Sequence, residues 1–498
     1  METIAITFPQ VKVNLGLENA TFDTIENTVF ETVQHIGRKA IEKALFDIDT
    51  ILKEKRPKGV LENTGKREKY FLTRLGDIRY KRSRYRDKAT GKPRYLLEEK
   101  LGIAKNQRIS LSRAKIEISI ASMVPYRETK RVSELLTGYR RSHESIRQSV
   151  LKEAKKIIAY QEGAINKIKR LEDEEESERI IPEIAYIETD EAYIRLQRRK
   201  KRKKQVRQRK RKRRSLAIKM GIGYTGRESR YGSGRKIAQR LTEKFVYVSM
   251  GNGRRFMENL SLIAEKKVTL SAVKNIFVGG DGDQWITRGI EDFFPGAKYL
   301  LCLFHLYRNI KRALCYRKDE QKIVKRLIRD DKIDEALSVI EEMMSNPRDE
   351  KEKEALEGLC YYIRENRRGI NVIQHIAEKE IREKVKGAGA IEPNIDKIIA
   401  HRFKKRGMSW SVRGALSLLK VKESIVNGEW EEWWDGKRDE KIDINLEPLK
   451  RLSAKDFWKK EKGTVPLVEA TIPALRGPDQ GEPWVKVLRE LQSIDYYK

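Results

Sequence analysis

The spacing of apolar and polar residues changes twice along the chain, from helical to strand-like and back to helical. Residues 18 to 55 repeat apolar residues at helical spacing, and residues 71 to 87 alternate them around Leu75-Gly76-Asp77, which predicts a basic hairpin. Between 111 and 158 the pattern predicts three helices, with the second ending at Gly138 and the third starting after Ser142. The first third of the chain is therefore predicted to be mostly helical.

The third of these helices combines an apolar face with a basic face. Arg147 and Lys152 lie on the basic side, together with Lys155 and Lys156. The apolar side is formed by Ile146, Val150, Leu151, Ala154, Ile157 and Ile158. Helices joined by a short glycine turn have the spacing of a helix-turn-helix that reads DNA, although a plain helical hairpin with a solvated basic face has the same pattern.

Strand periodicity starts after the acidic run at residues 172 to 178. Five segments follow, with a helix expected between the third and fourth and another between the fourth and fifth. The segments are IAYIETDEAYIRLQ, SLAIKMGIGYTG, KFVYVSMG, NIFVGGDG and AKYLLCLFHL. Helical spacing returns from residue 317 to 386, so the centre of the chain is predicted to be an α/β core followed by a helical segment.

The chain carries a large excess of positive charge. Its 498 residues include 108 Lys or Arg and 74 Asp or Glu, a net charge of +34, which indicates a polyanionic partner, most simply nucleic acid. Fifteen of the basic residues lie between 195 and 214, between two predicted strands, where they are placed to bind phosphates; a nuclear-localisation-like or unstructured run is the alternative. The DNA-binding candidates in this tract are Arg198, Arg199, Lys200, Arg209 and Arg211.

Membrane and disulfide-stapled classes are disfavoured by the sequence. No stretch approaches the roughly 20 apolar residues of a membrane span, and the start METIAITFPQVKVN lacks the order of a signal peptide. The 3 cysteines are too few and too odd in number for a disulfide framework. We therefore expect a soluble cytoplasmic protein.

Two aspartates lie where the predicted strands could hold a metal. Asp190 is in the middle of the first strand, and a carboxylate buried there needs a partner or a metal. Asp281 closes the fourth strand, where an ordinary surface turn is the alternative. If the two strands are neighbours, the carboxylates lie side by side and repel each other unless cations intervene. Two Mg²⁺ ions about 4 Å apart, held by about three carboxylates, are a known arrangement for attack on a phosphodiester.

The strand order, these two aspartates and the segment GAIEPNIDKIIAHRFKKRGMSWSVRGA resemble DDE transposases of bacterial insertion sequences, in particular the Mutator-like group that includes the ISLre family. The resemblance implies a mixed α/β fold: a ribonuclease H-like catalytic core with a helical insertion, preceded by an α-helical DNA-binding region with a helix-turn-helix and a β-hairpin. It also implies that Asp190, Asp281 and Glu392 are the catalytic residues and hold two Mg²⁺ or Mn²⁺ ions.

Under this interpretation the chain divides into six parts. They are a helical region with the basic hairpin (1–110), the helix-turn-helix and linker (111–180), the first part of the core (181–316), the helical insertion (317–386), the second part of the core with the third acid (387–427) and a C-terminal tail (428–498).

Further residues near the site are implied by the resemblance. Cys302 and His305, on the predicted fifth strand, match a motif of the group and are placed at the active site; a core histidine is the alternative for His305. A structural zinc site there is disfavoured, because zinc normally has four ligands and no second Cys or His pair stands nearby in the sequence. Asp283 is expected to be an accessory at most. The phosphate-binding candidates after the third acid are Lys404, Lys405 and Arg406.

The third acid is less clearly placed than the other two. Pro393 favours the first helical position, so Glu392 is expected to be the N-cap of a helix. Asp396, about one turn later, is a competing candidate.

The function implied is metal-dependent phosphoryl transfer, in which water frees a 3′-hydroxyl at a transposon end and that hydroxyl attacks target DNA. The expected partners are double-stranded DNA and further copies of the chain, as a dimer or larger, in a synaptic complex. The resemblance places the protein in the bacterial cytoplasm, associated with the nucleoid. The alternatives are a non-catalytic DNA-binding protein derived from a transposase and a structure-selective nuclease with the same fold.

Overall fold

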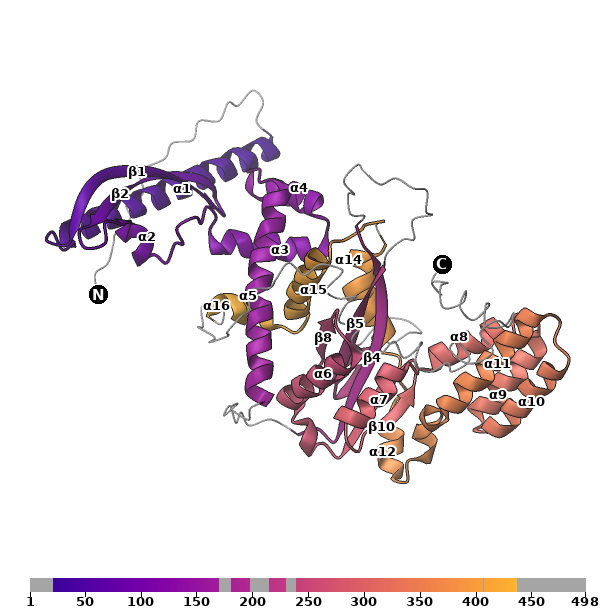
Figure 1. The fold of residues 1–498 in the computed structure, drawn as a ribbon. Helices are drawn as coiled ribbons and strands as arrows, with labels where there is room; N and C mark the ends of the chain where they lie inside the picture. Colours follow the sequence, from indigo (N-terminus) through magenta and orange to yellow (C-terminus); the bar gives the residue numbers. More distant parts are fainter. Residues whose placement is uncertain (1–20, 170–180, 198–214, 230–238, 406, 437–498) are drawn as a thin grey trace, which may run out of the picture. The chain divides into compact units, whose positions relative to one another are not determined.

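The computed structural model describes residues 21–169, 181–197, 215–229, 239–405 and 407–436, and the chain separates into two compact units (Figure 1). Unit 1 comprises residues 1–152 and unit 2 residues 153–498, so the boundary falls inside one long helix, α5 (His143–Lys169). No helix in the described ranges has the length and apolar character needed to cross a membrane.

Unit 1 contains the predicted long helix, hairpin and short helices. The hairpin turns at Gly76, whose φ of 116° lies in the region that favours glycine. Phe71 and Ile78, which face each other across the two strands, pack with Tyr80 and Leu97 and with the apolar side of the long helix. The elements are α1 (Phe22–Lys55), β1 (Leu61–Thr73), β2 (Gly76–Asp87), β3 (Pro93–Arg94), α2 (Leu96–Lys100), α3 (Leu111–Met123), α4 (Tyr126–Thr137) and the start of α5.

A buried ion pair joins the short helices of unit 1. Arg113 of α3 donates to Glu117 at 2.9 Å and to the Ser133 hydroxyl of α4 at 2.6 Å, and Arg113 and Glu117 are both fully buried. Gly138 ends α4 in the left-handed conformation, with φ 71°, as its place after the predicted second helix suggested. Ile146 and Val150 of α5 are buried, which confirms the predicted apolar face of that helix in unit 1.

Unit 2 is built on a five-stranded mixed sheet with strand order β10-β9-β4-β5-β8. Strands β4, β5 and β8 are antiparallel neighbours, whereas β9 and β10 run parallel to β4. This confirms the α/β prediction, and the first and fourth predicted strands, β4 and β9, are neighbours. The elements to this point are β4 (Ile184–Arg195), β5 (Ser215–Tyr224), β6 (Gly226–Ser229), β7 (Gln239–Thr242), β8 (Phe245–Ser249), α6 (Gly253–Val268), β9 (Asn275–Gly280), α7 (Gln284–Phe293) and β10 (Lys298–Leu301).

Different helices cover the two faces of the sheet. Ala185 and Ile187 of β4 belong to the core formed with α6 and α7. Side chains alternate along a strand, so Glu188 and Asp190 lie on the opposite face. There α13 (Ile391–Ile395) lies against β4, whereas α15 (Val412–Val426) lies at the free edge of β8, where Glu423 and the following Asn427 accept from the N–H groups of Val248 and Val246. Asp190 is therefore presented to the segment that carries Glu392.

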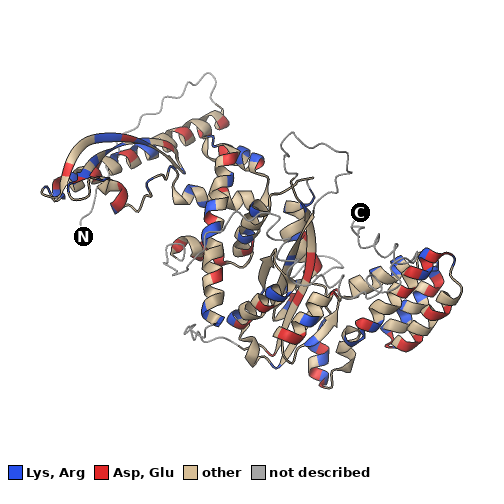
Figure 2. Cartoon of the chain, in the orientation of Figure 1, with Lys and Arg blue, Asp and Glu red and all other residues tan. Residues whose placement is uncertain are grey.

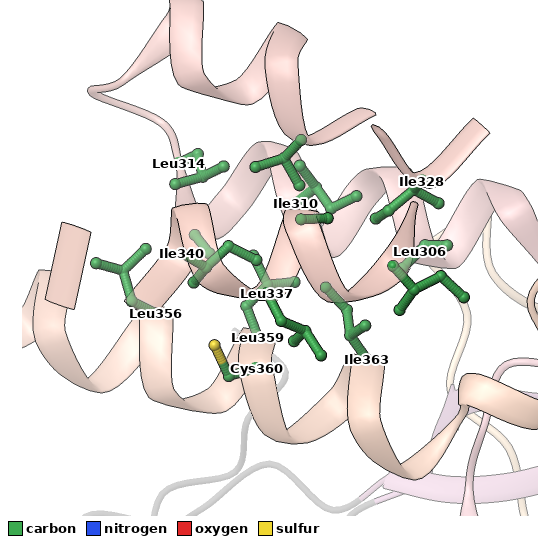
Figure 3. Packing of buried hydrophobic residues seen from close by; sticks show 14 of the residues in the cluster. Leu306, Ile310, Leu314, Ile328, Leu337, Ile340, Leu356, Leu359, Cys360 and Ile363 are labelled. Carbon is green, nitrogen blue, oxygen red and sulfur yellow. The ribbon is translucent and has the colours of Figure 1, made fainter. Parts of the chain in front are cut away.

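A helical insertion with its own core follows β10 (Figure 3). The predicted fifth strand was too long: β10 ends at Leu301, and residues 303–306 are helical. Leu303, Leu306 and Ile310 recur at helical spacing and pack into the core of the insertion, which stabilises a helix there. The remaining elements are α8 (Leu303–Ala313), α9 (Lys318–Arg329), α10 (Ile333–Ser345), α11 (Glu350–Glu365), α12 (Lys379–Lys384), α13, α14 (His401–Phe403), α15 and α16 (Glu429–Asp435).

Candidate active site

The strand ends of the sheet bring two of the predicted acids together. β4 pairs with β9 in parallel up to Glu188 opposite Gly279, so Asp190 and Asp281, each two residues further along, come level with each other. Asp190 is 7% exposed. β10 ends beside them, because the Cys302 N–H donates to the Gly280 carbonyl at 2.8 Å.

The predicted site residues form one cluster in space. One ligand atom from each of Asp190, Asp281 and His305 lies within 4.8 Å of the others, and the same holds for Cys302, His305 and Glu392. His305 belongs to both groups, and its Nε2 lies 3.2 Å from Glu392 Oε1. The site therefore joins residues that are far apart in the sequence: Asp190 and Asp281 are 91 positions apart (281 − 190), and Asp281 and Glu392 are 111 positions apart (392 − 281).

Burial and neighbouring carboxylates raise the pKa values of Asp190 and Asp281. Burial raises the pKa of Asp190 to about 8, and the neighbouring Asp281 and Glu392 carboxylates add to the rise. Burial, followed by the charge of Asp283, raises the pKa of Asp281 to about 7. Without a cation this pair retains protons near neutral pH, and a bound divalent ion would displace them.

Cys302 and His305 sit at the start of α8, so His305 is on a helix and not on the predicted strand. Cys302 is the N-cap of α8, and burial raises the pKa of its thiol to about 11. Burial, together with Arg308 and Arg312, lowers the pKa of His305 to about 4. The imidazole is therefore neutral at pH 7 and has a lone pair available to a metal or a proton.

Glu392 lies in the first turn of α13, and the expectation that it is the N-cap was wrong. The N-cap is Ala390, and Pro393 occupies the third helical position, where its missing N–H costs no helical hydrogen bond. A π-helical turn (Asp396–Ala400) follows directly and leads into α14. The competitor Asp396 is exposed and forms an ion pair with Lys405 at 2.7 Å, so it does not join the cluster.

Glu188 was not predicted from the sequence, yet it holds the segment that carries Glu392. Its side chain is 2% exposed, and Oε2 accepts from the backbone N–H groups of Gly389 at 2.9 Å and Ile391 at 3.0 Å. Its Oε1 accepts from the Tyr224 hydroxyl at 2.6 Å. Glu188 thus connects β4 to the start of α13. The sequence feature that could have identified Glu188 is its spacing of two residues from Asp190, which places both acids on the same face of the strand.

The loop after β9 is fixed by the helical insertion. The Tyr362 hydroxyl of α11 donates to the Asp281 carbonyl at 2.6 Å, and the Asp283 N–H donates to Asp281 Oδ1 at 3.0 Å. Gly282 has a φ of 98°, and a Cβ at this position would meet the Asn366 side chain at 2.5 Å. Glycine is therefore required between the two aspartates, and Asp283, at the N-cap of α7, contacts Asp281 through its backbone.

The predicted DNA-binding residues differ in their exposure and in their ion pairs, and several lie outside the described residues. Lys404 and Lys405 are exposed after α14, and Lys404 lies close enough to lower the pKa of Glu392, which burial raises. In unit 1, Lys152 is exposed, whereas Arg147 forms an ion pair with Glu144 at 2.7 Å. The candidates that lie outside the described residues are Arg198, Arg199, Lys200, Arg209, Arg211 and Arg406.

The donor set fits a divalent cation. Three carboxylates supply the oxygen ligands that Mg²⁺ and Mn²⁺ prefer. Glu392 Oε1 and His305 Nδ1 are buried without a hydrogen-bond partner, and a nearby cation would satisfy such an oxygen. Two sets of ligand atoms are close enough for a metal ion, Asp190 with Asp281 and His305, and Cys302 with His305 and Glu392.

The chain matches the Uncharacterised protein family (UPF0236) over residues 16–441, and it belongs to that family. It is 24% identical over 401 residues to a UPF0236 protein of Caldanaerobacter subterraneus subsp. tengcongensis that carries eleven gene designations, covering 80% of this chain and 76% of that protein. A UPF0236 protein in the vanSb 3′ region of Streptococcus gallolyticus is 22% identical over 406 residues, covering 80% of this chain and 82% of that protein.

Among solved structures, the Drosophila P element transposase strand transfer complex is similar at a TM-score of 0.22 and 8% identity, covering 69% of this chain and 84% of that chain. A similarity at that TM-score establishes no common fold.

Proposed function

We propose that this member of the UPF0236 family is a DDE transposase, which cleaves and joins DNA strands with the help of divalent metal ions. The observation that carries the proposal is that Asp190 lies beside Asp281 and within reach of the charge of Glu392, while His305 is a close neighbour of all three acids, which come from three separate segments. We interpret the sheet, with three antiparallel strands followed by two parallel ones, as ribonuclease H-like, and the helices α8 to α12 as the insertion before the third acid.

Asp190, Asp281 and Glu392 would hold two Mg²⁺ or Mn²⁺ ions. Bound there, the ions would activate the attacking hydroxyl and neutralise charge at the leaving oxygen. The raised pKa values of Asp190 and Asp281 support this assignment, because closely spaced buried carboxylates are stable as a charged pair only beside a cation.

The residues around the acids have roles of their own in this proposal. Glu188 positions Glu392 through the backbone of α13, and Tyr362 positions Asp281 through the carbonyl that it binds. Arg308 and Lys404 both lower the pKa of Glu392, so their positive charge is near enough to bind a DNA phosphate entering the site.

DNA binding is assigned to both units. Lys and Arg line much of the β1–β2 hairpin in unit 1 (Figure 2), and α3, α4 and α5 have the order and turn of a helix-turn-helix with Lys152 exposed. The net charge of +34 supports a polyanionic partner. Recognition of two transposon ends at once would need at least two copies of the chain.

One relative adds independent support. The Caldanaerobacter protein carries eleven gene designations, and a protein encoded several times in one organism is what repeated transposition of its gene would leave.

The test uses labelled DNA that carries the flanking ends of the gene's own element, with Mg²⁺ or Mn²⁺. We expect wild-type protein to nick these ends. Each of Asp190→Asn, Asp281→Asn and Glu392→Gln should slow cleavage at least a thousandfold, which corresponds to a rise of roughly 4 kcal/mol in the activation free energy when a metal ligand is lost. Asp396→Asn is the matched control, because Asp396 is an exposed acid on the same helical segment and should leave cleavage unchanged. Binding without cleavage by the wild type would contradict the proposal and favour a non-catalytic DNA-binding protein.

A further inference from the structure

We propose that Cys302, His305 and Glu392 form a binding site for a soft divalent cation such as Zn²⁺, and that this site overlaps the proposed two-metal site by sharing Glu392 and by using His305, which also lies close to Asp190 and Asp281. Its occupation would remove Glu392 from the oxygen-ligand set and inhibit DNA cleavage. The inhibition rests on the function proposed above, whereas the binding does not.

The distances suit one tetrahedral ion. Ligand atoms of the three residues all lie within 4.8 Å of one another, and His305 Nε2 is 3.2 Å from Glu392 Oε1. Two ligands bound to one zinc ion at the usual metal distances of about 2.0–2.1 Å are separated by about 3.3 Å in a tetrahedral site. The histidine and glutamate are therefore already spaced as two ligands of one such ion.

The chemistry of the donors differs from that of the three acids. Thiolate and imidazole prefer zinc and related ions, whereas Mg²⁺ prefers oxygen alone. A sulfur, a nitrogen and a carboxylate oxygen, with a fourth position open, are the ligand pattern of open zinc sites. A structural site with four protein ligands is not needed, which removes the objection that the sequence raised against zinc here.

All three ligands are held by their surroundings. Cys302 is the N-cap of α8, and its backbone N–H is bound to the Gly280 carbonyl. His305 lies one turn further along the same helix, so both side chains come from one end of α8. Glu392 is held by the hydrogen bonds from the start of α13 to Glu188. Because these side chains are already held in place, they lose little conformational freedom when a cation binds.

Unsatisfied polar atoms at this place also indicate a ligand. His305 is 6% exposed, and its Nδ1 is buried without a hydrogen-bond partner. Glu392 Oε1, which faces the imidazole, is likewise buried and without a hydrogen-bond partner. Such atoms are rare in folded proteins and call for an explanation, and a cation between the side chains supplies one for the carboxylate oxygen.

Binding would change only protonation and coordination. The Cys302 thiol would lose its proton to solvent as the metal–sulfur bond forms, and neither the metal nor the sulfur would change oxidation state. Mg²⁺ would not recruit the sulfur, so the oxygen-ligand set and the sulfur-containing set would select different ions.

The test uses Co²⁺ as a spectroscopic substitute for Zn²⁺, added to the metal-free full-length chain without oxygen. We expect a sulfur-to-cobalt charge-transfer band with the intensity of one thiolate per chain, and we expect Zn²⁺ to abolish it by displacing the cobalt. Cys302→Ser should lose the band. Cys315→Ser and Cys360→Ser are matched controls, since Cys315 is exposed and Cys360 packs against Met344 in the core of the insertion, and both should keep it.

Two further variants keep the proposal testable if Cys302→Ser does not fold. His305→Gln and Glu392→Gln retain the thiol, and each should weaken Co²⁺ binding at least tenfold. The proposal is overturned if saturating Co²⁺ gives no charge-transfer band with the wild type, or if the band survives unchanged in Cys302→Ser.

Failure of the proposed function gives a different result from failure of this inference. A chain that shows the Cys302-dependent band but never cleaves DNA would keep the soft-metal site and lose the transposase assignment. A chain that cleaves DNA with Mn²⁺ but shows no band would keep the transposase assignment and lose this site. When both hold, micromolar Zn²⁺ should inhibit cleavage by the wild type and inhibit Cys302→Ser at least tenfold less.

Discussion

Replacement of Glu188 tests whether one buried carboxylate holds the third acid in place. Glu188→Ala removes the acceptor for the Tyr224 hydroxyl and for the N–H groups of Gly389 and Ile391. Glu188→Gln keeps one oxygen for the two N–H groups and can donate to the Tyr224 oxygen, so it preserves most of the network. Both variants should therefore destabilise the protein, and Glu188→Ala should do so by the larger amount.

The magnitude follows from the hydrogen bonds lost. A buried donor left unpaired costs about 1–3 kcal/mol. With each of the three donors near the lower end of that range, Glu188→Ala should lower the free energy of unfolding by about 3–5 kcal/mol. Glu188→Gln disturbs one of the three bonds and should cost about 1–2 kcal/mol. Glu183→Ala is the matched control, because Glu183 makes an exposed ion pair with Lys384 and its loss should cost less than about 1 kcal/mol.

The assay is urea denaturation followed by tryptophan fluorescence. All 7 tryptophans lie between residues 285 and 484, so the signal reports on unit 2. Mn²⁺ titration of the same variants measures whether Glu392 is displaced, and Glu188→Ala should bind Mn²⁺ at least tenfold more weakly than Glu183→Ala. If Glu188→Ala unfolds at the same urea concentration as Glu183→Ala and binds Mn²⁺ equally well, the positioning role of Glu188 is wrong.

Three further predictions concern pH, the core of unit 1 and DNA binding. The folded, metal-free protein holds protons on Asp190 (pKa about 8) and Asp281 (pKa about 7) that the unfolded chain releases near pH 4, so its stability should fall as pH rises from about 4 to about 8. Asp190→Asn should reduce that fall in urea midpoints, and an unchanged pH profile would refute the shifted pKa values. Arg113→Ala leaves the buried Glu117 with Arg141 as its remaining ion partner and removes the donor to the Ser133 hydroxyl, so protection of α3 from hydrogen exchange should drop by about 1–3 kcal/mol, and full protection would show that Arg113 is dispensable. Arg79→Ala, on the exposed side of the hairpin, should lower the salt slope of DNA binding by about 1, whereas an unchanged slope would exclude this residue from the phosphate contacts.

The sheet could be predicted because its signals are local. Strand periodicity identified all five strands, and Asp190 and Asp281 could be assigned because each lies in or directly after a strand of clear pattern. The structure confirms the five strands. Whether the first and fourth are neighbours was open in the sequence, and the structure pairs them as β4 and β9.

The errors came from patterns that fit two structures. Leu303 and Leu306 continue the apolar run of β10, so the strand was extended, but their contacts with the later helices stabilise α8 instead. His305 therefore reaches the site from a helix. Packing against segments distant in sequence decided the outcome, and periodicity over ten residues cannot register it.

The hydrogen bonds around Glu392 and Asp281 could not be predicted from the sequence, because they too join segments that are distant in sequence. Glu188 and Ile391 are 203 residues apart, and Tyr362 and Asp281 are 81 apart. Pro393 indicated a helix start, but the N-cap is Ala390, and the N–H groups of its neighbours Gly389 and Ile391 donate to the distant Glu188. Local propensity sets where a helix can begin, and long-range hydrogen bonds select the exact residue.

The most direct test of the central claim is a strand-joining assay with Mn²⁺, using pre-cleaved, labelled ends of the element that carries this gene and a supercoiled target plasmid. Wild-type protein is expected to join the labelled 3′ ends to the plasmid, and Asp281→Asn is expected to bind the ends with equal affinity and yield no joined product. Joined product from Asp281→Asn at the wild-type rate, or none from the wild type with correct ends, would contradict the assignment of this site.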